Sequence, residues 1–153
     1  NRKVVSYQIE VAKCLAEFKA GIVRDVANSP YDKEHIVTKT NKKMIGKLIQ
    51  IRDERLFFRV EFGPGQFGET PCAWTELSPS SILELGDFYY LLKQKEPQPN
   101  NADVARRAIA LAVFAREYAL PENKIRAYLS QASQTGADVK EIYERLFPPN
   151  PPR

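Results

Sequence analysis

The feature that most constrains the fold is a block of alternating polar and apolar residues, 35–79, between two regions with helical spacing. Its clearest part is 55–62, where every second side chain is apolar. That apolar set is Leu56, Phe58, Val60 and Phe62. Because successive side chains of a strand point to opposite faces, the alternation predicts a strand with one apolar face.

Three other segments of the block are typical of strands. Residues 35–40 are short and β-branched, and 69–75 carry a proline, Pro71, that favours an edge position. Residues 43–52 alternate, which puts Leu48 and Ile51 on opposite faces. The block therefore predicts four short antiparallel strands.

Turn residues separate these strands. Asn41-Lys42 and Asp53-Glu54 are suited to hairpin turns, and the glycine-rich stretch 63–68 predicts a longer loop. Tight turns and short strands, in a chain too short for a sandwich, favour a small, strongly curved barrel.

Helical spacing governs both flanks. Residues 3–27 carry one apolar stripe, and Asn28-Ser-Pro30 ends it. Ser78 and Pro79 are typical of an N-cap and a first helical residue. Further helices are predicted over about 102–118, from Pro121 to a left-handed cap at Gly136, and from a capping box at Asp138-x-x-Glu141 to about Phe147.

The prediction is an α+β fold with an N-terminal helix, a small curved antiparallel β-barrel and a C-terminal helical tail. The divisions are 1–30 for the helix, 31–78 for the barrel, 79–147 for the tail with a helical hairpin, and 148–153 for a Pro-rich linker. Because the first residue is Asn1 and Met44 is the only methionine, we expect the chain to be a piece of a longer protein.

Two families share patterns with the chain. The run Thr40-Asn-Lys-Lys-Met-Ile-Gly46-Lys-Leu48 resembles the first hairpin of the Sm-like fold, over about 20–76, and an SH3-like barrel fits nearly as well. The Sm-like resemblance implies a sharply bent strand at Gly46, whereas that family's RNA-contacting residues have no counterpart here. Residues 107–115 and 127–132 resemble a tetratricopeptide helical hairpin, over about 102–135. The combination looks like accessory modules of large bacterial multidomain proteins.

Charge is concentrated in the strand block. Residues 33–59 hold eight Lys or Arg against three acids, a net of +5, whereas the whole chain carries +4. A positive face with an interleaved aromatic residue is what phosphate contact and base stacking require. The nucleic-acid candidates are Lys42, Lys43, Lys47, Arg55, Arg59 and Phe57. The competing interpretation is a solvated strand face whose charge opposes edge pairing.

Residue types needed for catalysis are scattered. His35 is the only histidine, and Cys14 and Cys72 stand far apart, so no metal site of usual spacing is expected. The glycines of 63–68 lack the Lys-Ser/Thr of a phosphate loop. We therefore expect no enzyme and no cofactor, with a hydrolase-type activity as the third and weakest interpretation.

The best-supported expectation is a non-enzymatic protein-interaction or assembly module that binds another protein or a second copy of itself. Its candidate contact residues are Phe57, Phe67 and Tyr90. Phe57 stands on a polar strand face, and we expect a flanking helix to cover it. RNA or DNA is the alternative partner. No membrane insertion is expected, because no apolar run approaches the roughly 18 residues that a span needs.

Overall fold

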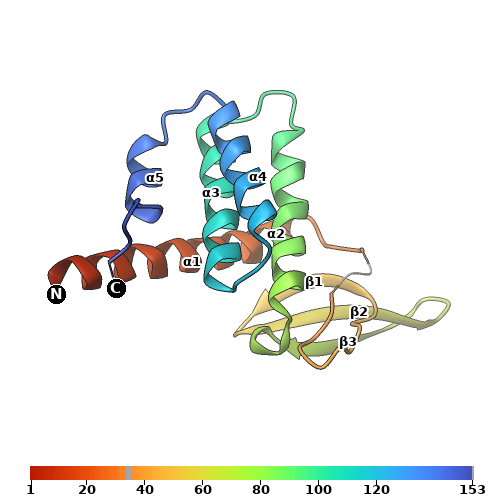
Figure 1. Cartoon of the computed structure of the whole chain (residues 1–153). Coiled ribbons are helices and arrows are strands. Elements are labelled where there is room, and N and C mark those ends of the chain that lie inside the picture. The colour runs from red at the N-terminus through yellow and green to blue at the C-terminus, as the bar shows by residue number, and fades with distance from the viewer. Residues whose placement is uncertain (34–35, 153) are drawn as a thin grey trace. The chain divides into compact units, whose positions relative to one another are not determined.

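The computed structural model describes residues 1–33 and 36–152 and shows an α+β protein (Figure 1). In these residues the chain forms α1 (Arg2–Asn28), β1 (Lys47–Arg52), β2 (Arg55–Gly63), β3 (Gln66–Ala73), the 3-10 turn η1 (Trp74–Glu76), α2 (Pro79–Gln94), α3 (Asn101–Glu117), α4 (Glu122–Gln134) and α5 (Lys140–Leu146). The predicted α+β class, long N-terminal helix and helical tail are confirmed.

The sheet is open and antiparallel, with strand order β1-β2-β3. No closed barrel exists in the described residues, so the predicted Sm-like or SH3-like barrel is wrong. The segment expected to form its first strand contributes isolated bridges instead, Val37 to Lys43 and Thr38 to Leu77. His35, at the start of that predicted strand, lies outside the described residues.

Local hydrogen bonding explains why the first predicted strand is missing. The Oγ1 of Thr38 accepts a hydrogen bond from the backbone N–H of Lys42 at 3.0 Å. Asn41 has a positive φ of 63°, so the chain reverses tightly here. A side chain that bonds the nearby backbone competes with a strand ladder. The result is a short irregular loop where a strand was predicted.

The hairpin turns follow the sequence closely. Asp53 and Glu54 have φ values of 51° and 62°, as in the two-residue turns that suit the twist of a hairpin. The second hairpin closes at Gly63 opposite Gln66, so β3 begins earlier than the predicted residue 69. Pro71 does lie on an edge strand, as predicted, because β3 pairs only with β2 among the described strands.

The observed ends of the helices show which local sequence signals predict a helix boundary correctly. The Oγ of Ser78 accepts from the N–H of Ser81 at 3.2 Å, which confirms the predicted N-cap of α2. Gly136 has a φ of 74°, as expected for a left-handed cap. The capping box at Asp138 is wrong, because α5 begins at Lys140 and its N-cap, Val139, makes no side-chain cap bond.

The chain forms two compact units, residues 20–86 and residues 1–19 with 87–153. We call them the sheet unit and the helical unit. The core of the sheet unit includes the fully buried side chains of Val26, Leu48, Leu56, Phe58, Leu77, Leu83 and Leu85. In the helical unit, α3 and α4 lie side by side as the predicted helical hairpin (Figure 1). The small residues Ala105, Ala108, Ala112 and Ala115 of α3 are completely buried.

None of the helices in the described part of the chain combines the length and the hydropathy that a membrane-spanning helix requires.

Candidate functional site

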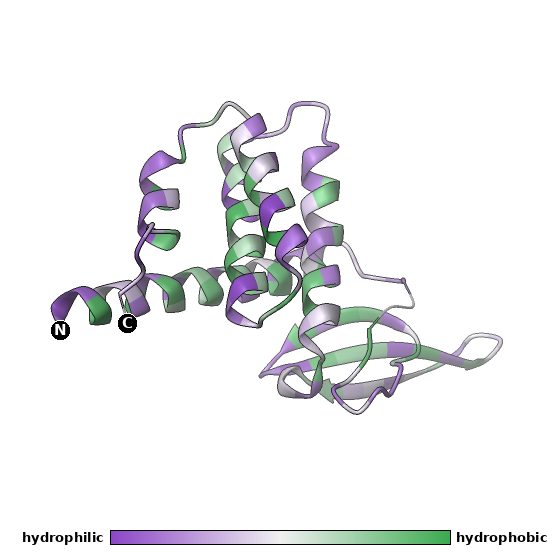
Figure 2. Cartoon of the chain, viewed as in Figure 1, coloured by the Kyte–Doolittle hydropathy of each residue, from purple (hydrophilic) through white to green (hydrophobic). Residues whose placement is uncertain are grey.

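The end of the β2–β3 hairpin exposes large apolar side chains. The pairing of β1 with β2 ends at Lys47 opposite Arg59, whereas β2 and β3 stay paired as far as Gly63. In this region the exposed fractions of Phe62, Ile45 and Phe67 are 72%, 68% and 51%. Figure 2 shows the end of β2 next to the loop in green. We call Ile45, Phe62 and Phe67 the hairpin-end cluster, in which Phe62 lies on the face of Gly68 and Phe67 on the opposite, outer face.

Glycines hold this cluster in place. Gly46 has a φ of 107° and lies against β2, so that a Cβ there would stand 2.6 Å from the carbonyl oxygen of Arg59. Ile45 is therefore held at the same end of β2 as Phe62. The ring of Phe62 occupies the space where a side chain of Gly68 would be. Both contacts need a residue without a Cβ.

The reason for the exposure of Phe62 is its position along β2. It shares a face with Leu56 and Phe58, which are buried. The core of the sheet unit covers these two residues but not the end of the strand. The alternation correctly predicts an apolar face, and the length of the hairpin carries its last member into solvent.

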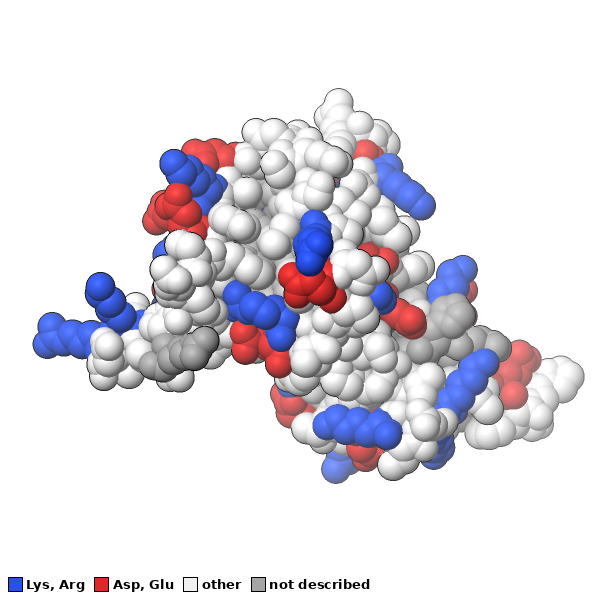
Figure 3. Space-filling model, in the orientation of Figure 1, with Lys and Arg blue, Asp and Glu red and all other residues white. Residues whose placement is uncertain are grey.

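The outer face of the sheet carries positive charge. In the β1–β2 register, Lys47 lies opposite Arg59 and Arg52 lies opposite Arg55. Gln50 and Phe57 form the pair between them. We call Lys47, Arg52, Arg55 and Arg59 the basic strip. All four are exposed, and Figure 3 shows Lys and Arg side chains in blue on the surface over the strands.

Two guanidinium groups lie over aromatic rings. The guanidinium carbon of Arg52 is 4.4 Å from the centre of the Phe57 ring, and that of Arg59 is 3.9 Å from the centre of the Phe67 ring. Phe57 is partly buried, and the group over its ring is Arg52, where a helix was expected. Such pairs orient the cation by the ring quadrupole.

The structure brings together some of the predicted site residues and separates others. Phe57, Lys47, Arg55 and Arg59 share the outer face, and Phe67 joins them at its end. Lys42 and Lys43 are exposed in the loop before β1. Tyr90 lies in α2 and is 1% exposed, so it cannot contact a partner from this position.

Sequence reasoning missed Phe62, Ile45 and Arg52 as contact candidates. For Phe62 a signal existed, because it is the last apolar residue before the Gly63-Pro-Gly65 turn and so the farthest from the core along its strand. Ile45 carries the same signal beside Gly46. Arg52 gains its position from a bulge between Leu48 and Gln50, which the alternation alone does not reveal.

A second polar cluster lies inside the helical unit. The hydroxyl of Tyr128 donates to Oδ1 of Asp87 at 2.9 Å. Burial raises the pKa of Tyr128 above its ordinary value, and the Asp87 carboxylate raises it further. The Tyr90 ring stands edge-on to the Tyr128 ring at 6.3 Å. This arrangement stabilises neutral phenols and offers no activated base or nucleophile.

The described metal-ligating residue types do not cluster, and the two cysteines are not activated. Among the described residues, no cluster of His, Cys, Asp and Glu could hold a metal ion. Burial raises the pKa of the Cys14 thiol to about 11, and burial followed by the charge of Glu76 raises the pKa of Cys72. Thiolates react and thiols do not, so neither cysteine is set up as a nucleophile.

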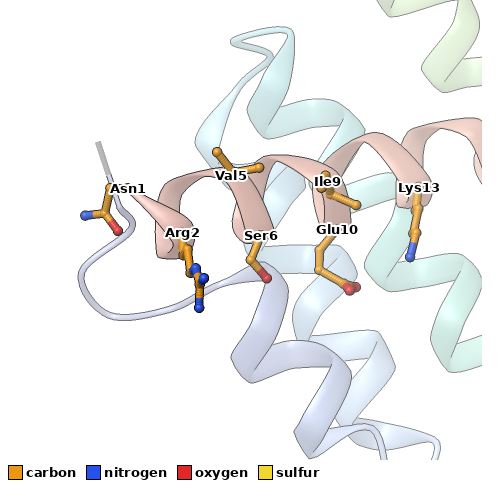
Figure 4. Close-up of a pocket in the computed structure, with 7 residues that line it drawn as sticks. All are labelled: Asn1, Arg2, Val5, Ser6, Ile9, Glu10 and Lys13. Atoms are coloured by element: carbon orange, nitrogen blue, oxygen red, sulfur yellow. The ribbon is translucent and has the colours of Figure 1, made fainter.

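One pocket lies on the first turns of α1 (Figure 4). It is lined by Asn1, Arg2, Val5, Ser6, Ile9, Glu10 and Lys13. All of these come from one helix end, and their side chains form no acid–base or ligand set. The sheet unit therefore holds the stronger candidate site.

Comparison with protein-family models, curated proteins and solved structures finds no match to the chain.

Proposed function

We propose that the chain is a non-enzymatic protein-interaction module, and that the hairpin-end cluster docks into an apolar site on a partner protein. The observation that carries the proposal is the exposure of Phe62, Ile45 and Phe67 at one end of one sheet. Burying an exposed side chain of this size contributes about 1.5–3 kcal/mol. Large side chains gathered in solvent are typical of contact surfaces.

Preorganisation supports the same proposal. Phe62 rests on Gly68, and Phe67 lies against Arg59, so both rings are oriented before any partner arrives. Side chains ordered in advance lose less entropy on binding. Docking through side chains also fits the edge of the sheet, because Pro71 in β3 lacks the N–H that a partner strand would need.

The experiment is a selection of displayed peptides against the full chain, followed by affinity measurements on two double variants. Phe62→Ser with Phe67→Ser removes the cluster. Leu92→Ser with Tyr118→Ser removes a similar exposed apolar area from the helical unit and is the matched control. We expect the selected peptides to lose affinity about tenfold or more for the first variant and to bind the control unchanged. Equal binding to both variants would refute the proposal.

A second candidate function is nucleic-acid binding through the basic strip together with Lys42 and Lys43 of the loop before β1. The observation that favours it is the pair of like-charged cross-strand positions on either side of Phe57. Single-stranded RNA or DNA would then bind with an affinity that falls steeply with salt, because counterions are released. The change Lys42→Glu with Lys43→Glu would weaken that binding while the fold survives. Absence of binding at low salt removes this candidate.

A further inference from the structure

We propose that the partner of this module contacts the basic strip with an extended acidic segment, whose pattern is acid-x-apolar-x-acid. The inference rests on the proposed function and specifies the chemistry of the partner. The surface consists of Lys47, Arg52, Arg55 and Arg59 around Phe57.

Like charges face each other across the basic strip. Like charges placed directly opposite each other on neighbouring strands destabilise a sheet. The strip contains two such pairs, Lys47 with Arg59 and Arg52 with Arg55. The pair between them, Gln50 and Phe57, brings no acid. On β3, Glu69 lies directly opposite Arg59, whereas Ala73 lies opposite Arg55, so the repulsion is greatest at the pair of Arg52 and Arg55. An anionic partner would relieve this repulsion.

The side chains on the outer face of β2 have the spacing of an extended chain. Arg55, Phe57 and Arg59 alternate along β2 on one face. With about 3.3 Å of rise per residue, the two cations are about 13 Å apart along the strand with the ring midway. An extended peptide has the same period. Two of its carboxylates at positions i and i+4 would therefore match the two arginines, and an apolar side chain at i+2 would lie over the pair that Arg52 forms with Phe57.

The geometry at the rings favours a peptide over a nucleic acid that stacks its bases on them. Arg52 and Arg59 each lie over a phenylalanine ring, within 4.4 Å and 3.9 Å of its centre. A base that stacked on either ring would have to displace the guanidinium from that face. A carboxylate needs only the N–H groups along the guanidinium edge, which bind carboxylates in a two-pronged fashion. An acidic peptide can use the surface as it stands.

The test uses a fluorescent peptide that repeats Glu-Ser-Leu-Ser, its Gln-Ser-Leu-Ser counterpart and a single-stranded oligothymidine, each titrated with the full chain. Arg52→Gln with Arg55→Gln alters the strip and leaves the hairpin-end cluster intact. Lys124→Gln with Arg126→Gln removes equal charge from exposed positions of α4 and is the control.

We expect the Glu peptide to bind at low salt and to weaken as salt rises. The Gln peptide should bind the unchanged protein at least about tenfold more weakly than the Glu peptide does. The Glu peptide should lose affinity for the strip variant by a similar factor and should bind the control variant as it binds the unchanged protein. Equal affinity for the two peptides overturns the inference. Tighter binding of the oligothymidine at the same salt also overturns it and assigns the strip to nucleic acid.

The two proposals fail separately. If selected peptides depend on Phe62 and Phe67 but are neutral, the docking function stands and the acidic partner is refuted. If the Glu peptide binds through the strip while selected peptides ignore the cluster, the strip assignment stands and the hairpin end is not the docking element.

Discussion

The guanidinium carbon of Arg59 lies 3.9 Å from the centre of the Phe67 ring. Arg59 belongs to the basic strip, and Phe67 belongs to the hairpin-end cluster. This contact therefore joins Phe67 to the charged outer face, whereas Phe62 lies on the opposite face of the hairpin. A partner that buries Phe67 must also meet the positive charge of Arg59, so one partner can use both the apolar docking and the acidic segment.

Gly46 and Gly65 form a matched pair for testing the sheet. Both have a positive φ, 107° and 73°, but only at Gly46 would a Cβ press on the backbone of β2, whereas nothing lies within 4 Å at Gly65. We predict that Gly46→Ala lowers the free energy of unfolding by about 2–4 kcal/mol and Gly65→Ala by about 1–2 kcal/mol. Urea denaturation measures both, and similar losses would contradict the close approach at Gly46.

Gly68→Ala should move the Phe62 ring without unfolding the protein. The added methyl group would meet the far edge of the exposed Phe62 ring, not backbone. We predict a stability change within about 1 kcal/mol and a weaker interaction with peptides that dock on the cluster. Thermal unfolding and peptide affinity measured together are decisive. A large stability loss would show that Phe62 is held more firmly than its exposure indicates.

Tyr128→Phe removes the hydrogen bond to Asp87 and leaves that carboxylate without this donor. We predict a loss of about 1–3 kcal/mol in the free energy of unfolding. The pKa of Tyr128 is raised in the folded protein, so its contribution is complete below the ordinary value of 10.0 and declines as the pH rises above it. Between pH 8 and 11 the urea midpoint should fall less steeply with pH in the variant than in the unchanged protein. Equal slopes in the two proteins would contradict this prediction.

Cys14 should react slowly with thiol reagents. Its pKa is raised from 9.0 to about 11 by burial, with the charge of Glu17 adding to the effect. A rise of about two units leaves about a hundredfold less thiolate at pH 8. The pKa of Cys72 is raised as well. Absorbance assays with an aromatic disulfide should show slow labelling in buffer and rapid labelling in urea, and rapid labelling of Cys14 in buffer would refute this expectation.

Arg116 is predicted to hold α5 in the helical unit. One guanidinium N–H group donates to the backbone carbonyl of Leu146, and the guanidinium carbon lies 4.5 Å from the centre of the Phe147 ring. Arg116→Gln should speed hydrogen exchange across α5 and leave β2 unchanged. Arg126→Gln, which alters only an exposed pair with Glu122, is the control. Unchanged exchange in α5 would show that Leu146 packing suffices.

Local sequence signals were enough to predict most of the helices and strands. The period of 3.6 predicts α1, and the period of two predicts β2, because burial on one face determines both patterns. Ser78 and Pro79 mark the start of α2 because capping depends on neighbouring residues alone. Asp53 and Glu54 mark a turn for the same reason.

Features that depend on long-range contacts could not be predicted from the sequence pattern. Whether residues 35–40 pair as a strand depends on competition with the Thr38 side chain. The bulge between Leu48 and Gln50 places Ile51 on the buried face with Leu48, against the simple alternation. The sequence predicts Tyr90 as a contact residue, whereas its side chain is buried, because the pattern of one helix does not say how many neighbours pack around it.

The same limit applies to the candidate site. Sequence reasoning found Phe57, Phe67 and most of the basic strip, because charge and aromatic residues are visible along the strands. It could not find that Phe62 lies beyond the core, since this depends on how far the rest of the sheet unit reaches along β2.

The most direct test of the central claim is an amide NMR titration of the full chain with the Glu-Ser-Leu-Ser peptide at low salt. We predict that chemical-shift changes gather on the basic strip, at Lys47 and from Arg52 to Arg59, and on Phe67 at its end, while α3 and α4 stay unchanged. Changes centred on the helices, or none across the sheet, would contradict it.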